Sequence, residues 1–253
     1  STWNLYLRSW NTMSMRLDQA AIDHYKTRTK AQDAIKDGRV FVNGKKIIKC
    51  AFRVEDTDRI TYQEIHQYVS RAAYKLLAAI HHFHIDLKNQ CVLDIGASTG
   101  GFSQVCLEQG ARKVYALDVG HLQLDPSLEK DSRLIKKEGC NAREIQLSDF
   151  EESIDFICMD VSFISSKTIL DHVLSLPWPH LETMVILIKP QFECGPAALN
   201  KKGVLKNKKL REKIIQDSIQ YLKQYFITVK AIDSPIEGRS GNLEALLYAK
   251  GKR

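Results

Sequence analysis

The sequence contains no apolar run near the roughly 20 residues that a helix needs to cross a bilayer. Its apolar runs, such as 184–188, are far shorter, and no stretch resembles a signal peptide. Neither a membrane-spanning nor a secreted protein is therefore expected. We predict a cytoplasmic protein with no stable membrane partner.

Paired cysteines are absent as well. The six cysteines form no Cys-x-x-Cys pair, and several lie within apolar runs; they are residues 50, 91, 106, 140, 158 and 194. This spacing argues against a zinc site and favours free, buried thiols. The histidine cluster at His81, His82 and His84 does not place its rings on one helical face, so we predict no metal site.

Positive charge is in excess. The 37 Lys and Arg against 30 Asp and Glu give a formal net charge of +7 and an isoelectric point of about 9.0. This balance favours a polyanionic partner, either nucleic acid or an anionic membrane. The 253 residues allow one domain of ordinary size and a small second one. We expect residues 1–14 to be a tail outside the fold, with Met13 or Met15 as a candidate natural start.

A strand, a glycine-rich turn and a helix start follow one another in residues 90–103, QCVLDIGASTGGFS. Gly96 and Gly100 allow a tight turn and a close approach of ligand to backbone, and the helix start offers unpaired N–H groups. Ser98 stands where the dinucleotide fingerprint has its second glycine, and no Gly-Lys-Ser/Thr follows, so neither a dinucleotide nor a P-loop nucleotide is expected. A nucleoside without a pyrophosphate fits better, and S-adenosylmethionine is the first candidate.

A second predicted strand, 113–118, ends in Asp118, about one βα unit downstream. An acid at this position suits the two ribose hydroxyls of an adenosine. The simpler alternative is an aspartate that caps the next turn.

Strands and helices alternate along the rest of the chain. We expect strands near 133–136, 155–160 and 184–189, a helix near 208–224, and two final strands near 226–233 and 243–249 with no helix between them. This order predicts an α/β fold of the Rossmann-type methyltransferase class, with a mostly parallel seven-stranded sheet and an antiparallel strand near one edge.

Four polar residues stand where such a sheet would expose them. Asp160 and Lys189 end consecutive strands, Lys75 lies on the helix before the glycine-rich motif, and Glu244 lies on the last strand. A ribose hydroxyl is a poor nucleophile that needs a base, and a lysine serves as one when a second cation nearby lowers its pKa. We assign Lys189 as the base, Lys75 as the residue that tunes it and positions the hydroxyl, and Asp160 and Glu244 as orienting groups.

The N-terminal part predicts a small α+β module. A helix begins at Arg16, a second one (30–37) is capped by Thr29 and ended by Gly38, and Asn43-Gly44 marks a hairpin. More strand character follows over 53–62. Basic residues occur throughout the module, a pattern that favours contacts to the backbone of folded RNA. The alternative is a basic surface that contacts only solvent. The predicted RNA contacts here are Arg16, Arg28, Lys30, Lys36, Arg39, Asn43 and Lys45.

The module resembles the α-L RNA-binding domain of a small-subunit ribosomal protein and of several RNA-modifying enzymes. The resemblance rests on Arg-Leu-Asp, on Thr-Lys before Ala-x-x-x-Ile, and on Gly-x-Val-x-Val-Asn-Gly. That family more often has Ser-Arg at Thr29-Lys30, so Lys30 keeps the charge without the bidentate fork.

From about Met15 to its end, the chain is similar to the TlyA family, relatives of the FtsJ/RrmJ group. The motifs are LDIGASTGGFS, Asp118-Val-Gly, CMDVSFIS, LIKPQFE and SPIxGxSGNxE. The resemblance implies S-adenosylmethionine-dependent 2′-O-methylation of cytidine ribose in ribosomal RNA, of the large subunit and in some members also of the small one. The family's Lys-Asp-Lys-Glu tetrad matches Lys75, Asp160, Lys189 and Glu244. Where the family often has Gly-Gly-His before the first lysine, this chain has Ala72-Ala73-Tyr74, and Tyr74 is expected to alter a nucleotide contact but not the tetrad.

The resemblance also implies the binding residues and the domain limits. The donor site is expected to contain Gly96, Ser98, Thr99, Gly100, Phe102, Asp118, Asn141 and Asp160. The basic run after Leu199 is expected to follow RNA phosphates through Lys201 and Lys202, with a solvated helix start as the alternative. The expected domains are an RNA-binding domain over 15–62, a linker over 63–69 and a methyltransferase domain over 70–253. The oligomeric state is not readable.

Three other functions are weighed. A base-modifying methyltransferase is disfavoured, because the segment after Asp160 has no Pro-Pro-aromatic motif and Cys194 does not follow a proline. A membrane-active haemolysin, a label that members of the family have carried, would need an apolar hairpin or a basic amphipathic helix that the sequence lacks. A ribosome-binding module without catalysis conflicts with the intact tetrad and donor loop.

Overall fold

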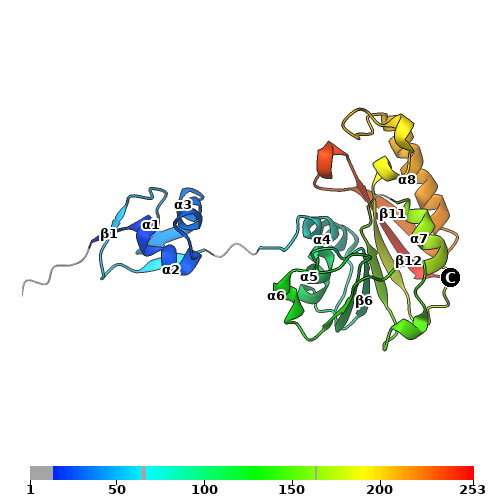
Figure 1. The fold of residues 1–253 in the computed structure, drawn as a ribbon, viewed down its shortest axis with the longest axis horizontal. Helices are drawn as coiled ribbons and strands as arrows, with labels where there is room; N and C mark the ends of the chain where they lie inside the picture. Colours follow the sequence, from blue (N-terminus) through cyan, green and yellow to red (C-terminus); the bar gives the residue numbers. More distant parts are fainter. Residues whose placement is uncertain (1–13, 64–66, 163) are drawn as a thin grey trace, which may run out of the picture. The chain divides into compact units, whose positions relative to one another are not determined.

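A seven-stranded sheet lies at the centre of the larger of two compact units (Figure 1). The computed structural model describes residues 14–63, 67–162 and 164–253. The smaller unit ends at Gln67 and the larger one begins at Tyr68.

The smaller unit combines three short helices with two small sheets. Its helices are α1 (Leu17–Ala20), α2 (Ile22–Tyr25) and α3 (Arg28–Lys36). Strand β1 (Met15–Arg16) pairs with β4 (Arg53–Val54), and β2 (Val40–Val42) lies between β3 (Lys45–Lys46) and β5 (Ile60–Tyr62), all antiparallel. Residues such as Leu17, Ile35 and Val40 form its buried core.

In the smaller unit, the predicted hairpin turn and helix end are confirmed, and the predicted helix cap is wrong. The hairpin turn forms at Asn43 and Gly44, which both have positive φ, and Gly38 follows α3 with a φ of 72°. The cap of α3 is Thr27 and not Thr29: its Oγ1 accepts a hydrogen bond from the N–H of Lys30 at 3.2 Å. Two threonines in alternate positions offer two caps, and the chain uses the earlier one, so that the helix begins at Arg28.

The sheet of the larger unit confirms the predicted fold class. Its strand order is β11-β12-β10-β9-β6-β7-β8, and β12 runs antiparallel to both of its neighbours, one strand in from the edge. The pairs β10–β9, β9–β6, β6–β7 and β7–β8 are parallel. The strands are β6 (Cys91–Ile95), β7 (Lys113–Leu117), β8 (Leu134–Lys137), β9 (Phe156–Met159), β10 (Thr183–Ile188), β11 (Phe226–Asp233) and β12 (Ala245–Lys252).

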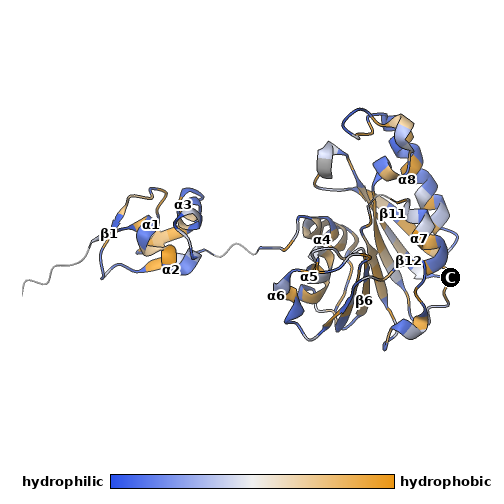
Figure 2. Cartoon of the chain, in the orientation of Figure 1, coloured by the Kyte–Doolittle hydropathy of each residue, from blue (hydrophilic) through white to orange (hydrophobic). Residues whose placement is uncertain are grey.

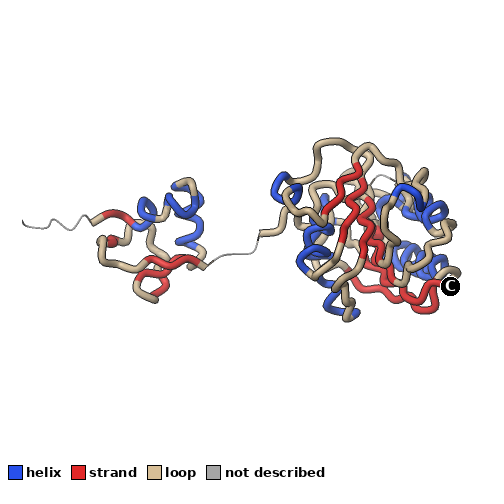
Figure 3. Tube along the Cα trace, turned by 90° about the horizontal axis from the view of Figure 1, so that it is seen from below, coloured by secondary structure: helices blue, strands red, loops and turns tan. Residues whose placement is uncertain are grey.

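Helices cover both faces of this sheet, as the view in Figure 3 shows. One buried cluster joins the sheet to α4 (Ala72–Phe83) and α5 (Gly101–Glu108), and another joins it to α7 (Ser166–Val173) and α8 (Lys208–Leu222). Figure 2 shows the hydrophobic character of the central strands between them. The short helices are α6 (Pro126–Glu129), η1 (Leu147–Asp149), η2 (Pro190–Phe192), η3 (Pro196–Ala198) and η4 (Arg239–Gly241).

Both faces of the central strands are covered, which explains the near-continuous apolar runs of β6, β9 and β10 in the sequence. Within the described residues, no helix combines the length and apolar character needed to span a membrane.

Candidate active site

The glycine-rich loop leaves β6 and enters α5 in the expected conformation. Gly96 and Gly100 have φ values of 79° and 102°, and Ser98 between them has a φ of 51°. Gly100 is the residue before the first turn of α5, and its N–H donates to the carbonyl of Ala97 at 2.8 Å. Phe102 is only 2% exposed and belongs to the buried cluster of α4 and β6, so its side chain supports the loop from the core.

Gly96 brings this loop into contact with the end of β9. A Cβ atom at Gly96 would lie 2.1 Å from the carbonyl oxygen of Asp160. The N–H of Asp160 in turn donates to the carbonyl of Ile95 at 3.0 Å. Only glycine combines this φ with so close a backbone approach, so Gly96 holds the loop directly against Asp160.

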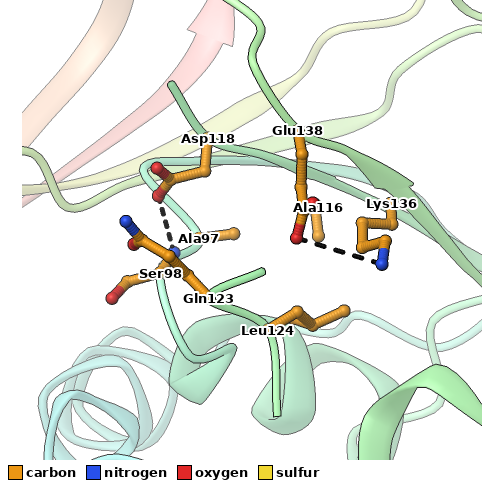
Figure 4. Close-up of a pocket in the computed structure, with 8 residues that line it drawn as sticks. All are labelled: Ala97, Ser98, Ala116, Asp118, Gln123, Leu124, Lys136 and Glu138. Carbon is orange, nitrogen blue, oxygen red and sulfur yellow. Dashed lines mark hydrogen bonds and ion pairs between the residues drawn. The ribbon is translucent and has the colours of Figure 1, made fainter. Parts of the chain in front are cut away.

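Asp118 closes the other side of the loop. Its two carboxylate oxygens each accept a backbone hydrogen bond of 2.8 Å, Oδ2 from Ser98 and Oδ1 from Gly120. Figure 4 shows these side chains around a small pocket, which is lined by Ala97, Ser98, Ala116, Asp118, Gln123, Leu124, Lys136 and Glu138. The expected donor-loop residue Ser98 and the expected acid Asp118 therefore lie together.

Two carboxylates line this pocket, those of Asp118 and Glu138. A carboxylate oxygen accepts more than one hydrogen bond, so Asp118 retains acceptor capacity toward ribose hydroxyls. Glu138 Oε1 is buried in the same pocket, where it accepts no hydrogen bond from the residues described and lies 3.9 Å from Lys136 Nζ in an ion pair (Figure 4). Sequence reasoning missed Glu138, although its place directly after β8 parallels that of Asp118 after β7.

Asn141 and Thr99, two predicted donor-site residues, accept hydrogen bonds from backbone N–H groups of nearby loops. The side chain of Asn141 accepts from the N–H of Arg143 at 3.0 Å, and Cys140 N–H donates to the carbonyl of Asp118 at 3.0 Å. The Thr99 carbonyl accepts from Asp125 N–H at 3.0 Å. These bonds connect the loops that follow β6, β7 and β8 at one end of the sheet.

The first of two lysine–carboxylate pairs joins α4 to Glu244, which lies directly before β12 and not on the strand as predicted. Lys75 Nζ lies 2.8 Å from Glu244 Oε2, and both side chains are almost fully buried. Gln191 Nε2 donates to the other oxygen of Glu244 at 3.3 Å. A Cβ atom at Gly238 would lie 2.1 Å from Glu244 Oε1, so the loop before β12 packs directly on this carboxylate.

The second pair lies between the ends of β9 and β10. Lys189 Nζ is 2.6 Å from Asp160 Oδ1 and donates to Ser162 Oγ at 2.7 Å. The side chains of Lys189 and Asp160 are 12% and 18% exposed, so this pair is more open than that of Lys75 and Glu244. Ser162 was not foreseen from the sequence.

The strand register brings the two pairs to one edge of the sheet. Ile188 pairs with Ala245 in the antiparallel ladder, so the next residues outward, Lys189 and Glu244, lie opposite each other. Ile186 pairs with Met159, which brings Asp160 to the same end. The structure thus brings all four predicted tetrad residues to the edge at which parallel α/β sheets bind ligands.

Asp94 lies in β6 and is fully buried. Ser103 Oγ donates to its Oδ2 at 2.7 Å. Burial raises the pKa of Asp94 to about 7, and the nearby charge of Asp160 adds to the rise, while the hydrogen bond from Ser103 opposes it. This carboxyl was not among the predicted site residues, because a position within an apolar strand gives no sign of its neighbours.

Some of the predicted RNA contacts already bind acidic side chains of their own unit. Arg16 and Arg28 both bind the buried Asp18, and the Arg39 side chain is 17% exposed and pairs with Asp37 at 3.0 Å. Asn43 donates to Asp58 at 2.7 Å. Arg28 and Asn43 are nevertheless exposed, as are the predicted lysines Lys30, Lys36, Lys45, Lys201 and Lys202.

The last two lysines lie on a tightly turned loop beside the site. Asn200 Oδ1 accepts from the N–H groups of Lys202 and Val204, both at 2.9 Å. The buried Asn242 joins this loop to the segment before β12: it accepts from Leu205 N–H at 2.9 Å and donates to the Gly203 carbonyl at 3.0 Å. Glu244 is two residues from Asn242.

The fold and this site define a Rossmann-type methyltransferase that carries a small basic unit before its catalytic domain. Residues 68–251 match the model of the FtsJ-like methyltransferases, and residues 15–60 match the S4 domain model. The chain belongs to the FtsJ-like methyltransferase family and, within it, to the TlyA group, as the sequence motifs predicted.

Relatives resemble the chain over nearly their whole length. "Hemolysin A" of Brachyspira hyodysenteriae is 43% identical over 238 residues, 92% of this chain and 99% of that protein. "16S/23S rRNA (cytidine-2'-O)-methyltransferase TlyA" of Mycobacterium tuberculosis is 36% identical over 89% of this chain and 85% of its own. A solved hemolysin-named structure from Streptococcus thermophilus has 33% identity and a TM-score of 0.68, covering 94% of this chain and 89% of that one.

Proposed function

We propose that the protein transfers the methyl group of S-adenosylmethionine to the 2′-hydroxyl of a cytidine in ribosomal RNA. The carrying observation is that two lysine–carboxylate pairs lie at the ligand edge of the sheet, in backbone contact with the glycine-rich loop through Gly96 and Asp160. The relatives named as rRNA (cytidine-2'-O)-methyltransferases support the reaction and the substrate class.

The donor site would use the loop, the pocket acids and the end of β9. S-adenosylmethionine supplies an electrophilic methyl group on a sulfonium. We place its nucleoside against Asp118, with Glu138 as an added acceptor for a hydroxyl. The donor-site residues we propose are Gly96, Ser98, Thr99, Gly100, Phe102, Asp118, Asn141 and Asp160.

In the reaction, a bond forms between the methyl carbon and the 2′-oxygen of the ribose, and the bond between the methyl carbon and sulfur breaks. A base accepts the proton of the hydroxyl. Lys189 is the proposed base, because it is the more open lysine and Asp160 and Ser162 fix its Nζ from two sides. Lys75, held by Glu244, positions the hydroxyl. Asp160 orients Lys189 and pairs with the ammonium that forms when Lys189 takes the hydroxyl proton, and Glu244 orients the Lys75 ammonium.

RNA would be bound by the basic residues of both units. We propose that Lys201 and Lys202 contact backbone phosphates close to the reacting nucleotide, because Asn242 fixes their loop to the segment that carries Glu244. In the smaller unit, we propose contacts through Arg16, Arg28, Lys30, Lys36, Arg39, Asn43 and Lys45.

The test is transfer of radiolabelled methyl groups from S-adenosylmethionine to separated, unmodified ribosomal subunits. We expect incorporation into the large subunit, recovered as an alkali-stable 2′-O-methylcytidine, and the small subunit assayed in parallel shows whether it is a second substrate. Donor binding without incorporation into either subunit would contradict the ribosomal assignment and favour a non-catalytic binding module or another RNA.

A membrane activity is the second candidate, because the Brachyspira relative carries the name Hemolysin A. Release of a trapped dye from lipid vesicles by the purified protein tests it directly. The methyltransferase proposal predicts no release above that of a heat-denatured sample.

A further inference from the structure

We propose that Gln191 and Glu193, which follow the proposed base Lys189 in the chain, are positioning residues for methyl transfer. Their side chains fix the turn of η2 to two neighbouring parts of the larger unit and thereby hold Lys189 against its partners. Of the sequence motif LIKPQFE, the proposed reaction uses Lys189 alone. The role in transfer rests on the proposed function, whereas the anchoring rests on contacts within the larger unit.

The backbone of Lys189 lies beyond the paired residues of β10. Ile188 is the last residue of that strand to pair with β12, and Ile186 is the last to pair with β9. The Lys189 carbonyl accepts from the N–H of Phe192 at 2.9 Å, which is a bond within the turn itself. The position of Lys189 therefore depends on the contacts that hold η2 to the rest of the unit.

Glu193 holds the end of this turn to the start of α7. Its Oε2 accepts from Ser165 Oγ at 2.7 Å, and its Oε1 accepts from the N–H of Ser166 at 2.8 Å. Ser165 precedes the first turn of α7, and its side chain makes no capping bond of its own. No acidic residue lies in that first turn, so the Glu193 carboxylate supplies the negative charge that the amino end of a helix favours.

Gln191 ties the middle of the turn to the other lysine–carboxylate pair. Its Nε2 donates to Glu244 Oε1 at 3.3 Å, while Lys75 Nζ lies 2.8 Å from Glu244 Oε2. The Gln191 side chain is buried, and its Oε1 accepts no hydrogen bond from the described residues. Because a buried amide oxygen without a partner costs stability, packing alone would favour an apolar residue here. The bond to Glu244 is what this amide contributes.

The turn of η2 thus connects the two lysine–carboxylate pairs. Lys189 binds the loop after β9, Gln191 binds the residue before β12, and Glu193 binds the start of α7. A displacement of a catalytic group by about 1 Å lowers a reaction rate by as much as about a hundredfold. We therefore expect the loss of either anchor to slow transfer without weakening donor binding.

The experiment measures methyl transfer to unmodified large ribosomal subunits by the full-length wild type, Glu193→Ala and Gln191→Met. Each variant is expected to lower kcat about tenfold and to leave KM for S-adenosylmethionine within about twofold of the wild type. Glu193→Gln keeps an acceptor oxygen for the Ser166 N–H and an amide N–H that reaches Ser165 Oγ, so it should restore most of the rate. An unchanged kcat in either of the first two variants would overturn the role of that residue.

Asp171→Ala is the matched control for the stability of α7. Asp171 is another carboxylate on this helix, and it binds Lys167 and the hydroxyl of Tyr221 on α8. None of these residues belongs to η2. We expect Asp171→Ala to change kcat less than about threefold, because exposed ion pairs contribute little and the turn stays anchored. A loss of kcat equal to that of Glu193→Ala would show that Glu193 acts only by stabilising α7.

Ser162→Ala tests whether Glu193 acts through Lys189. If Ser162 and Glu193 both hold Lys189 Nζ in place, the effects of removing them are not additive. Glu193→Ala, which costs about tenfold in the wild type, is therefore expected to cost less than about threefold in Ser162→Ala. Fully multiplicative losses would exclude a common action on Lys189. If Glu193→Ala does not fold, Ser165→Ala, which removes the bond to Oε2 alone, takes its place with the same expected coupling.

Crystal structures of the variants give a readout that does not depend on the proposed function. In Glu193→Ala, Lys189 Nζ is expected to leave hydrogen-bond distance of Asp160 or Ser162, and in Asp171→Ala it is expected to stay. This displacement, together with a wild type that transfers no methyl group, would refute the proposed reaction and leave the anchoring of Lys189 standing. An unmoved Lys189 in Glu193→Ala would refute the positioning role of Glu193.

Discussion

Lys75 and Glu244 are 169 residues apart in the sequence, and their Nζ and Oε2 atoms lie 2.8 Å apart. The two side chains are 10% and 2% exposed. The pair joins the first helix of the larger unit to the residue directly before its last strand, so this contact forms only when the two ends of that unit come together. A buried ion pair by itself is weak evidence for stability. Removing one of its two partners is more informative, because the other charge is then left buried without a partner.

Glu244→Ala is expected to destabilise the protein by about 3–5 kcal/mol, because the Lys75 ammonium is left buried without its partner. Urea unfolding measures the change. The double variant Lys75→Met with Glu244→Leu is the control, and it is expected to be more stable than Glu244→Ala alone. A loss below about 1 kcal/mol for Glu244→Ala would show that water replaces the carboxylate.

Ser162→Ala is expected to lower kcat by roughly tenfold to a hundredfold, the effect of losing one hydrogen bond to a charged group. Ser162 accepts the bond from Lys189 at 2.7 Å and is exposed, so the change should leave stability nearly intact. Ser162→Thr keeps the hydroxyl and should restore most of the rate. Steady-state kinetics with the RNA substrate decide the case, and an unchanged kcat would remove Ser162 from the account.

Gly96→Ala is expected to reduce donor affinity at least about tenfold, because its Cβ would meet the Asp160 carbonyl at 2.1 Å. Gly195→Ala is a matched control. The φ values of Gly96 and Gly195 are 79° and 76°, and nothing lies within 4 Å of a Cβ placed at Gly195. Both variants carry the strain of alanine at positive φ, about 1–2 kcal/mol, and only Gly96→Ala carries the clash. Calorimetric titration with S-adenosylmethionine compares them, and equal affinities would contradict the contact.

Asp94 predicts a pH dependence of stability. Its pKa is about 7 in the folded protein and near 3.9 in an unfolded chain, so between these values the folded state keeps a proton that the unfolded state has released. The contribution of this group to the free energy of unfolding is therefore complete below about pH 4 and is lost as the pH rises through about 7. Relative to Asp94→Asn, the wild type should lose stability over that window. Urea unfolding at several pH values checks this, and parallel curves for the two proteins would contradict it.

The sequence was sufficient for the sheet and for the positions of three polar residues at its ligand edge, for a physical reason. Buried parallel strands read as apolar runs, and the residue after each run lies at the ligand edge, which is how Asp118, Asp160 and Lys189 were found. Those positions depend on the local pattern and on the direction of the strands alone.

Features set by tertiary contact were missed. The partnership of Lys189 with Ser162, the burial of Asp94 near Asp160, and the bond from Ser165 to Glu193 depend on register between distant segments. The cap of α3 was misplaced by two residues because Thr27 and Thr29 carry the same local signal. A single sequence shows which residues carry groups suited to binding or catalysis, and the folded structure shows which of them are in contact.

The most direct test of the account is methyl transfer to unmodified large subunits by the wild type, Lys189→Ala and Lys230→Ala in parallel. Lys230 is an exposed lysine of β11 outside the site, so its variant controls for the loss of one positive charge. The account predicts 2′-O-methylcytidine from the wild type and from Lys230→Ala, and a rate at least about a hundredfold lower from Lys189→Ala with donor binding retained. Undiminished transfer by Lys189→Ala would contradict the assignment of Lys189 as the base.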